Sequence, residues 1–234
     1  MSNRPLPPRL SVVAVVWNAR DELEPFLESV LAQVDPATTE IVLVDNGSTD
    51  GSREILRERP EVVLIENDRN SGFGAGLNLG CAHATSPRLL LCNPDLEFRP
   101  GAIDALVATL DAEPALGGVG PIIRIEGGGV CPLLRGHPGI TYGWSFFTGL
   151  MAKFPRSRWI NAHFDHDPAR RSHRQPWLHG CCGLYRRDAF RAIGGFDERF
   201  FLYFEDCDLG RRLTEAGWRL ALAPDAEVQH REGG

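Results

Sequence analysis

Polar side chains collect at the ends of three apolar runs of this 234-residue sequence. Trp17-Asn18 follows the first run, Asp45-Asn46-Gly47-Ser48 follows the second, and Asn93-Pro94-Asp95 follows a later one. Open α/β sheets bind ligands beyond the carboxyl ends of their strands, so these residues predict a site. The Asp45 carboxylate could accept a hydrogen bond from the imide N–H that uracil and thymine share. Asp-Asn-Gly-Ser is also strong turn chemistry, and both interpretations can hold together.

A glycine-rich segment, residues 70–78 (NSGFGAGLN), opens a predicted helix. Glycines let a backbone approach a ligand closely, and the N-terminus of a helix favours anions. The segment therefore predicts contact with a nucleotide, with a tight loop packed on the sheet as the alternative. It is not the dinucleotide-binding fingerprint, because that pattern belongs in the first strand-to-helix turn, which here is residues 17–20.

Acidic side chains begin another predicted helix, at Glu205, Asp206 and Asp208. A positioned carboxylate can take the proton of an attacking hydroxyl, a contribution of about 10²–10⁴-fold to a rate. The preceding aromatic run, 200–204, predicts a packed wall beside the acids. The alternative is that the acids only favour the helix N-terminus.

The elements that would position these groups alternate along the first half of the chain. The predicted strands are residues 10–16, 40–44, 61–66 and 88–92, and the predicted helices are 21–34, 51–59, 72–83 and 101–110. This alternation predicts an α/β fold with a mostly parallel sheet and helices on both faces. The pattern weakens after about residue 117, and residues 126–176 have no sustained period. Order returns in segments 177–187, 188–193 and 200–204, a helix near 206–216 and a strand at 218–223.

The composition limits the possible functions and locations. A formal charge of -6 argues against bulk binding of nucleic acid, which needs a basic face. Six cysteines without a C-x-x-C pair predict buried thiols in a reducing compartment. The polar segment 1–9 is unlike a secretory signal, and no apolar run reaches the ~18 residues of a membrane span. The expected location is the cytoplasm, with the inner face of the cell membrane as a place of action.

The ordered set of motifs resembles family 2 glycosyltransferases, which have the Rossmann-like GT-A fold. The set spans about residues 10–233 and is most similar to the branch of bacterial rhamnosyltransferases of cell-surface polysaccharide assembly. The motifs are VVWN (15–18), VDNGSTDGS (44–52), NSGFGAGLN (70–78), NPD (93–95), WLHG (177–180), GGFDERFFLYFEDCDLGRR (194–212) and H-x-x-G (230–233).

The resemblance implies an inverting transferase that moves a sugar from dTDP-rhamnose or a UDP-sugar to a saccharide or lipid-linked acceptor. It implies Mg²⁺ or Mn²⁺ bound by Asp95 and His230, with Asp206 as the base and Glu205 supporting a sugar. The residues it assigns to the nucleotide are Val16, Asn18, Asp45, Asn46, Asn70, Gly72, Asn78 and Asn93. The residues it assigns to the donor or acceptor sugar are Trp177, His179 and Gly180.

Two departures from the family pattern affect these assignments. Asn93 stands where the metal motif usually begins with a carboxylate, so the metal would bind more weakly or residues 93–95 are only a turn. His179, Cys181 and Cys182 stand where relatives carry smaller residues, which leaves the donor sugar open; the alternative for 177–180 is a buried strand edge. His230 after a strand is also compatible with a structural role.

Two other functional hypotheses remain at this stage. A nucleotidyltransferase would need a basic, glycine-rich loop after the first strand, which residues 15–22 lack. A non-catalytic nucleotide-sugar-binding protein is the third hypothesis, and the acids at 95, 205 and 206 argue against it.

The second half of the chain leaves further alternatives. The segment 163–167 (HFDHD) suggests zinc, but no second cluster completes a tetrahedral site. A basic stretch between 153 and 174 is either a solvated loop or a docking surface for a lipid diphosphate or an anionic membrane. We expect one domain over 1–234, with a nucleotide-binding half of about 10–116 and an acceptor and catalytic half of about 117–234. The end at Gly234 is compatible with a truncated or a naturally short form.

Overall fold

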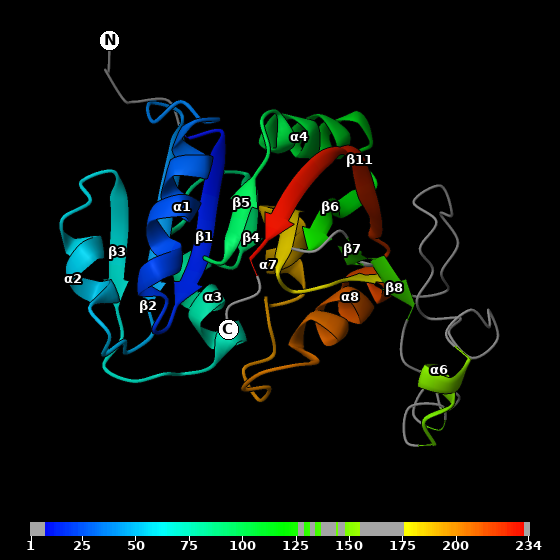
Figure 1. Cartoon of the computed structure of the whole chain (residues 1–234). Coiled ribbons are helices and arrows are strands. Elements are labelled where there is room, and N and C mark those ends of the chain that lie inside the picture. Colours follow the sequence, from blue (N-terminus) through cyan, green and yellow to red (C-terminus); the bar gives the residue numbers. More distant parts are fainter. Residues whose placement is uncertain are drawn as a thin grey trace, which may run out of the picture.

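The computed structural model describes residues 8–125, 129–131, 134–136, 144, 148–154 and 176–231. In this part of the chain a mixed sheet of nine strands forms the centre, and helices pack against it (Figure 1). The suggested zinc cluster, residues 163–167, lies outside the described residues, as do all the cations of the basic stretch except Lys153.

The first half alternates strands and helices as the apolar patterns predict. One short strand, β5, was not predicted; it follows Asp95 directly. The elements are β1 (Leu10–Val16), α1 (Arg20–Leu31), β2 (Thr39–Asp45), α2 (Ser52–Arg57), β3 (Val62–Glu66), α3 (Phe73–His83), β4 (Arg88–Cys92), β5 (Leu96–Phe98) and α4 (Ala102–Ala112).

In the described residues of the second half, two strands are longer than the sequence predicts. A ten-residue strand continues to Ile125, where the pattern had weakened, and the last strand runs on to His230 instead of ending near Ala223. The segment 200–204 forms neither helix nor strand. The elements are β6 (Leu116–Ile125), β7 (Gly129–Cys131), β8 (Leu134–Gly136), α6 (Leu150–Lys153), β9 (Pro176–Leu178), β10 (Cys182–Arg186), α7 (Arg187–Ala192), α8 (Glu205–Glu215) and β11 (Arg219–His230).

The order of the strands is β3-β2-β1-β4-β10-β6-β11-β5, with β7 beside β6. The first four strands are mutually parallel, as are β6 and β11. Strand β10 is antiparallel to both β4 and β6, and so joins the two halves into one sheet. The carboxyl ends of β2, β1 and β4 therefore lie in a row that meets the start of β10.

Both faces of the central strands are covered. Glycines on α3 allow close approach to β1, since a Cβ at Gly80 would lie 2.5 Å from Val13 Cγ1 and one at Gly76 would lie 2.7 Å from Val15 Cγ2. The alternate residues Val12, Ala14 and Val16 point to the opposite face and are also buried, which continuous apolar strands of a two-sided sheet predict. None of the helices in the described residues is long and apolar enough to cross a membrane.

Candidate active site

The strand-end segments after β1 and β2 are held together by hydrogen bonds. The carbonyl of Val16 accepts the Asn46 N–H at 2.7 Å. Asn18 has a left-handed φ of 51°, and its Oδ1 accepts the Thr49 N–H at 2.9 Å. The Ser48 hydroxyl oxygen accepts the Asn18 N–H at 3.0 Å. These contacts fix the edge of the sheet where the sequence predicts a nucleotide.

Asp45 is fully buried at the end of β2. Its Oδ2 accepts the Nε–H of Arg53 at 2.7 Å, in an ion pair with that guanidinium. Its Oδ1 is buried and has no hydrogen-bond partner among the described residues. Sequence reasoning missed Arg53, although a cation in the first turn of the helix after an acidic strand end is a usable signal. The ion pair therefore leaves one carboxylate oxygen with the capacity to accept a hydrogen bond.

Asn46 organises the loop that precedes α3. Its Oδ1 accepts hydrogen bonds from Asn67 Nδ2 at 2.9 Å and from both the N–H and the hydroxyl of Ser71. Its Nδ2 donates to Asn70 Oδ1 at 2.9 Å and to the Gly72 carbonyl at 3.2 Å. The Asn46 amide is thus occupied within the protein, and it holds the loop 67–72 against the end of β2.

The beginning of α3 meets the loops of the second half. Gly72 has a φ of 94°, and a Cβ there would lie 2.6 Å from the Phe201 carbonyl oxygen, which accepts the Phe73 N–H at 2.9 Å. The Asn78 amide donates to the Phe196 carbonyl and accepts the Phe196 N–H, both at 2.9 Å. Asn78, predicted to bind nucleotide, is therefore bonded to the 196–198 loop, while Gly72 sets the contact between the two halves.

Asp95 and His230, predicted as metal ligands, lie together. His230 Nε2 is 3.3 Å from Asp95 Oδ2, because β11 pairs with β5 and places His230 opposite Leu96. Asp95 Oδ1 and Asn93 Oδ1 are buried and have no hydrogen-bond partner among the described residues. The described residues contain no group of three or more His, Cys, Asp or Glu side chains that could hold a metal alone. Oxygen donors of this kind fit Mg²⁺ or Mn²⁺ bound by one carboxylate, with phosphate oxygens completing the coordination.

Glu205 and Asp206 begin α8 and are buried, with 4% and 9% of their surfaces exposed. Asp206 Oδ2 accepts the Gly180 N–H at 2.7 Å, and Oδ1 accepts the Cys207 N–H at 2.7 Å. Glu205 Oε2 is buried with no hydrogen-bond partner among the described residues. Burial, and secondarily the charge of Asp206, raises the pKa of Glu205 to about 7. Two adjacent carboxyl groups thus have different environments, one held by backbone N–H groups and one desolvated.

The sugar-binding candidates Trp177, His179 and Gly180 belong to the segment that leads into β10. The Trp177 and His179 rings are stacked with centroids 6.2 Å apart, and His179 Nδ1 is 3.1 Å from Cys181 Sγ. The Cys181 carbonyl accepts the Asn93 N–H at 2.9 Å. Residues 180 and 181 therefore contact Asp206 on one side and Asn93 on the other.

The aromatic run before the acids is not the packed wall that the sequence predicts. Phe201, Leu202, Tyr203 and Phe204 are 58%, 51%, 71% and 58% exposed. Tyr203 and Phe204 have left-handed φ values of 69° and 67°, which is rare for bulky residues and strained. The turn therefore directs these side chains outward while the acids that follow it point inward.

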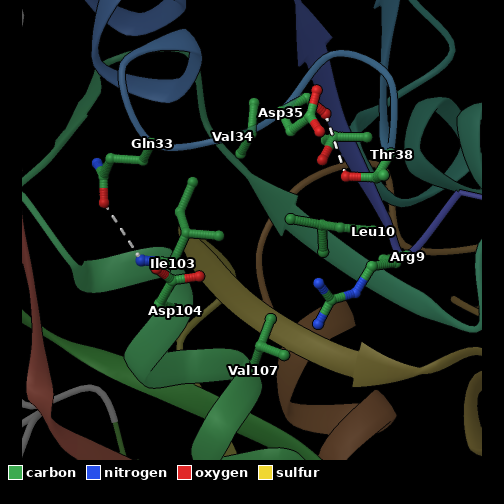
Figure 2. Close-up of a pocket in the computed structure, with 10 residues that line it drawn as sticks. Arg9, Leu10, Gln33, Val34, Asp35, Thr38, Ile103, Asp104 and Val107 are labelled. Carbon is green, nitrogen blue, oxygen red and sulfur yellow. Dashed lines mark hydrogen bonds between the residues drawn. The ribbon is translucent and has the colours of Figure 1, made fainter.

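A separate cavity of about 230 Å³ lies at the other end of the sheet (Figure 2). Leu10 and Thr39, the first residues of β1 and β2, line it together with the loop that follows α1 and the first half of α4. It contains none of the predicted site residues. Across it, Gln33 Oε1 accepts the Ile103 N–H at 3.4 Å (Figure 2).

Comparison with known sequences places the chain among transferases. The family model for glycosyl transferase family 2 matches residues 11–194. N-acetylglucosaminyl-diphospho-decaprenol L-rhamnosyltransferases of two Mycobacterium tuberculosis strains are 39% identical over 236 residues, which cover 94% of this chain and 75% of each relative. The O-antigen biosynthesis protein RfbC of Myxococcus xanthus is 30% identical, over 96% of this chain and 17% of its own length.

Solved structures of similar shape include a mannosyltransferase, PcManGT of Pyrobaculum calidifontis, in complex with GDP-Man and Mn²⁺. It has a TM-score of 0.68 at 20% identity, covering 98% of this chain and 59% of that one. GalNAc-T7 with UDP, GalNAc and Mn²⁺ has a TM-score of 0.72 at 18% identity, covering 97% of this chain and 44% of that one. At these identities the likeness shows the fold alone.

Proposed function

Because the chain belongs to glycosyl transferase family 2, in its rhamnosyltransferase-like branch, we propose that it transfers a sugar from a nucleoside diphosphate to a lipid-linked saccharide during polysaccharide assembly. The predicted enzyme class is confirmed, as is the GT-A type of α/β fold. The nucleotidyltransferase and non-catalytic hypotheses are set aside on the same findings. The donor, the acceptor and the roles of individual residues are the proposal.

One structural observation carries the assignment of roles. In the part of the chain that the structure describes, buried side-chain oxygens without a hydrogen-bond partner occur at Glu97, which is ion-paired with Arg231, and at four candidate site residues, Asp45, Asn93, Asp95 and Glu205. Leaving such a group unpaired costs about 1–3 kcal/mol, so each of these four is expected to pair with a ligand. The strand order separates Asp45, at the end of β2, from Asn93, after β4, by the single strand β1, and the bond from the Gly180 N–H to Asp206 holds the start of α8 against the segment that leads into β10 beside β4. A nucleotide sugar lying along this edge would place its base at Asp45, its diphosphate at Asn93 and Asp95, and its sugar near Gly180.

The base of the donor is proposed to be uracil or thymine. Asp45 Oδ1 offers an acceptor for an imide N–H, while Arg53 holds the other oxygen and fixes the plane of the carboxylate. A guanine would also present an N–H, but the rhamnosyltransferase relatives favour dTDP-rhamnose, with a UDP-sugar as the alternative. Val16, Asn18, Asn46, Asn70 and Gly72 then shape the pocket through their backbone and loop contacts.

A divalent metal is proposed to be bound by Asp95 and His230, with Asn93 as a neutral oxygen donor. When bound, the ion supplies neutralisation of the leaving diphosphate. Two similar structures contain Mn²⁺, which supports this assignment without fixing the metal here. The pairing of β5 with β11 places the Asp95 carboxylate next to the His230 imidazole.

Asp206 is proposed to act as the base of a single displacement. The acceptor hydroxyl oxygen forms a bond to the anomeric carbon as the bond from that carbon to the diphosphate oxygen breaks, and the hydroxyl proton passes to the carboxylate. The Gly180 and Cys207 N–H groups orient Asp206, which lowers the reorganisation needed at reaction. Glu205, partly protonated near neutral pH, is proposed to donate a hydrogen bond to a sugar hydroxyl.

The proposal also concerns the acceptor and the place of action. The rhamnosyltransferase relatives are described by a decaprenol-linked acceptor, and other relatives by undecaprenyl phosphate. A lipid-linked acceptor at the cytoplasmic face of the membrane is therefore proposed for this chain.

The test is calorimetric binding of dTDP, UDP and GDP, with and without Mn²⁺ or Mg²⁺, followed by transfer assays with the donors selected. Wild type is expected to bind dTDP or UDP in a metal-dependent manner, and Asp95→Ala to lose the metal dependence. Asp206→Asn is the matched variant, since it should bind the nucleotide normally and lose about 10²–10⁴-fold in transfer rate. If no diphosphate binds to the folded protein with either metal, the proposed donor site is wrong.

A further inference from the structure

The turn before α8 combines exposure with a fixed conformation. Its four consecutive apolar side chains, residues 201–204, are each more than half exposed. The Phe201 carbonyl accepts the Phe73 N–H at 2.9 Å, and the Phe204 carbonyl accepts the Asp208 N–H at 2.9 Å. The turn projects beside α3 beyond the end of the sheet (Figure 1). Bonds at both of its ends therefore maintain a strained backbone that turns apolar side chains into solvent.

The amino acids of this turn are those that favour a lipid–water boundary. Phenylalanine and leucine enter hydrocarbon readily, and tyrosine combines an apolar ring with a polar hydroxyl that stays at the interface. The turn is also continuous with the proposed acceptor site, because Phe204 is followed directly by Glu205 and Asp206. An acid that deprotonates a hydroxyl of a lipid-linked saccharide must come close to the surface from which that saccharide projects.

The size of the patch favours a bilayer over a protein partner. A stable protein interface takes about 20–30 residues a side, while an apolar loop needs only a few side chains to insert among lipid head groups. The charges next to the turn are net acidic, since Arg199 pairs with Asp197 at 2.6 Å while Glu198 between them is exposed and bonded, among the described residues, only to the Asn78 amide, and the chain as a whole has a formal charge of -6. These residues therefore supply no electrostatic attraction to anionic lipid.

We propose that the turn 201–204 inserts into the surface of the lipid bilayer and brings the acids of α8 to the head group of a membrane-held acceptor. The proposal rests on the proposed function for the identity of the acceptor, but the insertion itself needs neither donor nor acceptor.

The experiment measures co-sedimentation of the full chain with neutral phosphatidylcholine vesicles, in the absence of both substrates. The test variant is Leu202→Ser with Tyr203→Asn, since asparagine tolerates the left-handed φ at 203. Wild type is expected to bind with little effect of salt. The double variant should bind roughly 100-fold more weakly, about tenfold for each half-exposed side chain removed.

The matched control is Val63→Thr, which removes an exposed apolar side chain on the edge strand β3 and should bind vesicles like wild type. Circular dichroism and dTDP or UDP binding check that each variant is folded. Equal vesicle binding by wild type and the double variant, or binding that requires anionic lipid and disappears in salt, would overturn the proposal. Nucleotide binding that persists in that case would leave the proposed function intact.

Discussion

The desolvated carboxyl of Glu205 makes a quantitative prediction about stability. Its pKa is about 7 in the folded chain, against 4.5 for the free side chain, mainly because of burial and then because of Asp206. An acid whose pKa is raised by folding binds its proton more tightly in the folded state. Its contribution is therefore neutral at low pH and becomes destabilising as the pH rises from 4.5 through 7. A shift of this size corresponds to about 3 kcal/mol at high pH.

Replacing Glu205 with glutamine removes the titration while keeping the shape of the side chain. The free energy of unfolding of wild type should fall by about 2–3 kcal/mol more than that of Glu205→Gln between about pH 5 and about pH 8.5. Urea unfolding of both proteins across this range measures the difference directly. Glu28→Gln, at an exposed position of α1, is the control and should follow the wild-type pH dependence. Parallel curves for wild type and Glu205→Gln would refute the assignment of Glu205 as a buried, near-neutral acid.

Three further predictions concern the ligand and the contact between the halves. Asp45→Asn should weaken dTDP and UDP binding by about 10–100-fold in calorimetry, because the new amide N–H could face the imide N–H of the base. Unchanged affinity would mean that Asp45 does not contact the base. His230→Ala should reduce the effect of Mn²⁺ on UDP affinity without changing affinity in its absence; equal loss under both conditions would mean a structural role. Gly72→Ala should lower the free energy of unfolding, measured in urea, by about 2–4 kcal/mol, because a Cβ there meets the Phe201 carbonyl oxygen. The control Gly101→Ala, also at positive φ but with nothing within 4 Å of the added Cβ, should lower it by about 1–2 kcal/mol. Equal costs for the two glycine variants would show that the contact with Phe201 has no energetic weight.

The first half of the fold could be predicted because its signals are local. Each strand from β1 to β4 is a short apolar run, and Asp45 and Asn93 follow directly where such runs end. Strand β6 was missed because its sequence, LGGVGPIIRI, is rich in glycine and contains proline. In the structure, aromatic side chains from distant segments pack directly on those glycines. A Cβ at Gly117 would lie 2.7 Å from Trp218 Cβ, and one at Gly118 would lie 2.7 Å from Tyr185 Cδ1, so neither position has room for a side chain. This strand is stabilised by long-range packing that no local pattern contains.

The candidate site could likewise be predicted only in part from the sequence. The residue types at 95, 205, 206 and 230 indicated chemistry, but their proximity depends on long-range strand pairing, of Cys92 with Cys182 and of Leu96 with His230. The orphaned oxygens, the Arg53 ion pair and the occupied amides of Asn46 and Asn78 are visible only in three dimensions. The outward aromatic turn was misjudged because apolar composition alone predicts burial, whereas the left-handed φ values at Tyr203 and Phe204 direct the side chains to solvent.

The segment that leads into the antiparallel strand β10 contacts the rest of the site through its backbone, so its side chains can differ. Just before β10, the Gly180 N–H donates to the Asp206 carboxylate, and the Cys181 carbonyl accepts the Asn93 N–H. These two bonds do not depend on which side chain stands at 179 or 181. We therefore propose that substitutions of the His179 and Cys181 side chains alter which donor sugar is bound, while the proposed base, Asp206, and the proposed diphosphate site at Asn93 keep their spacing.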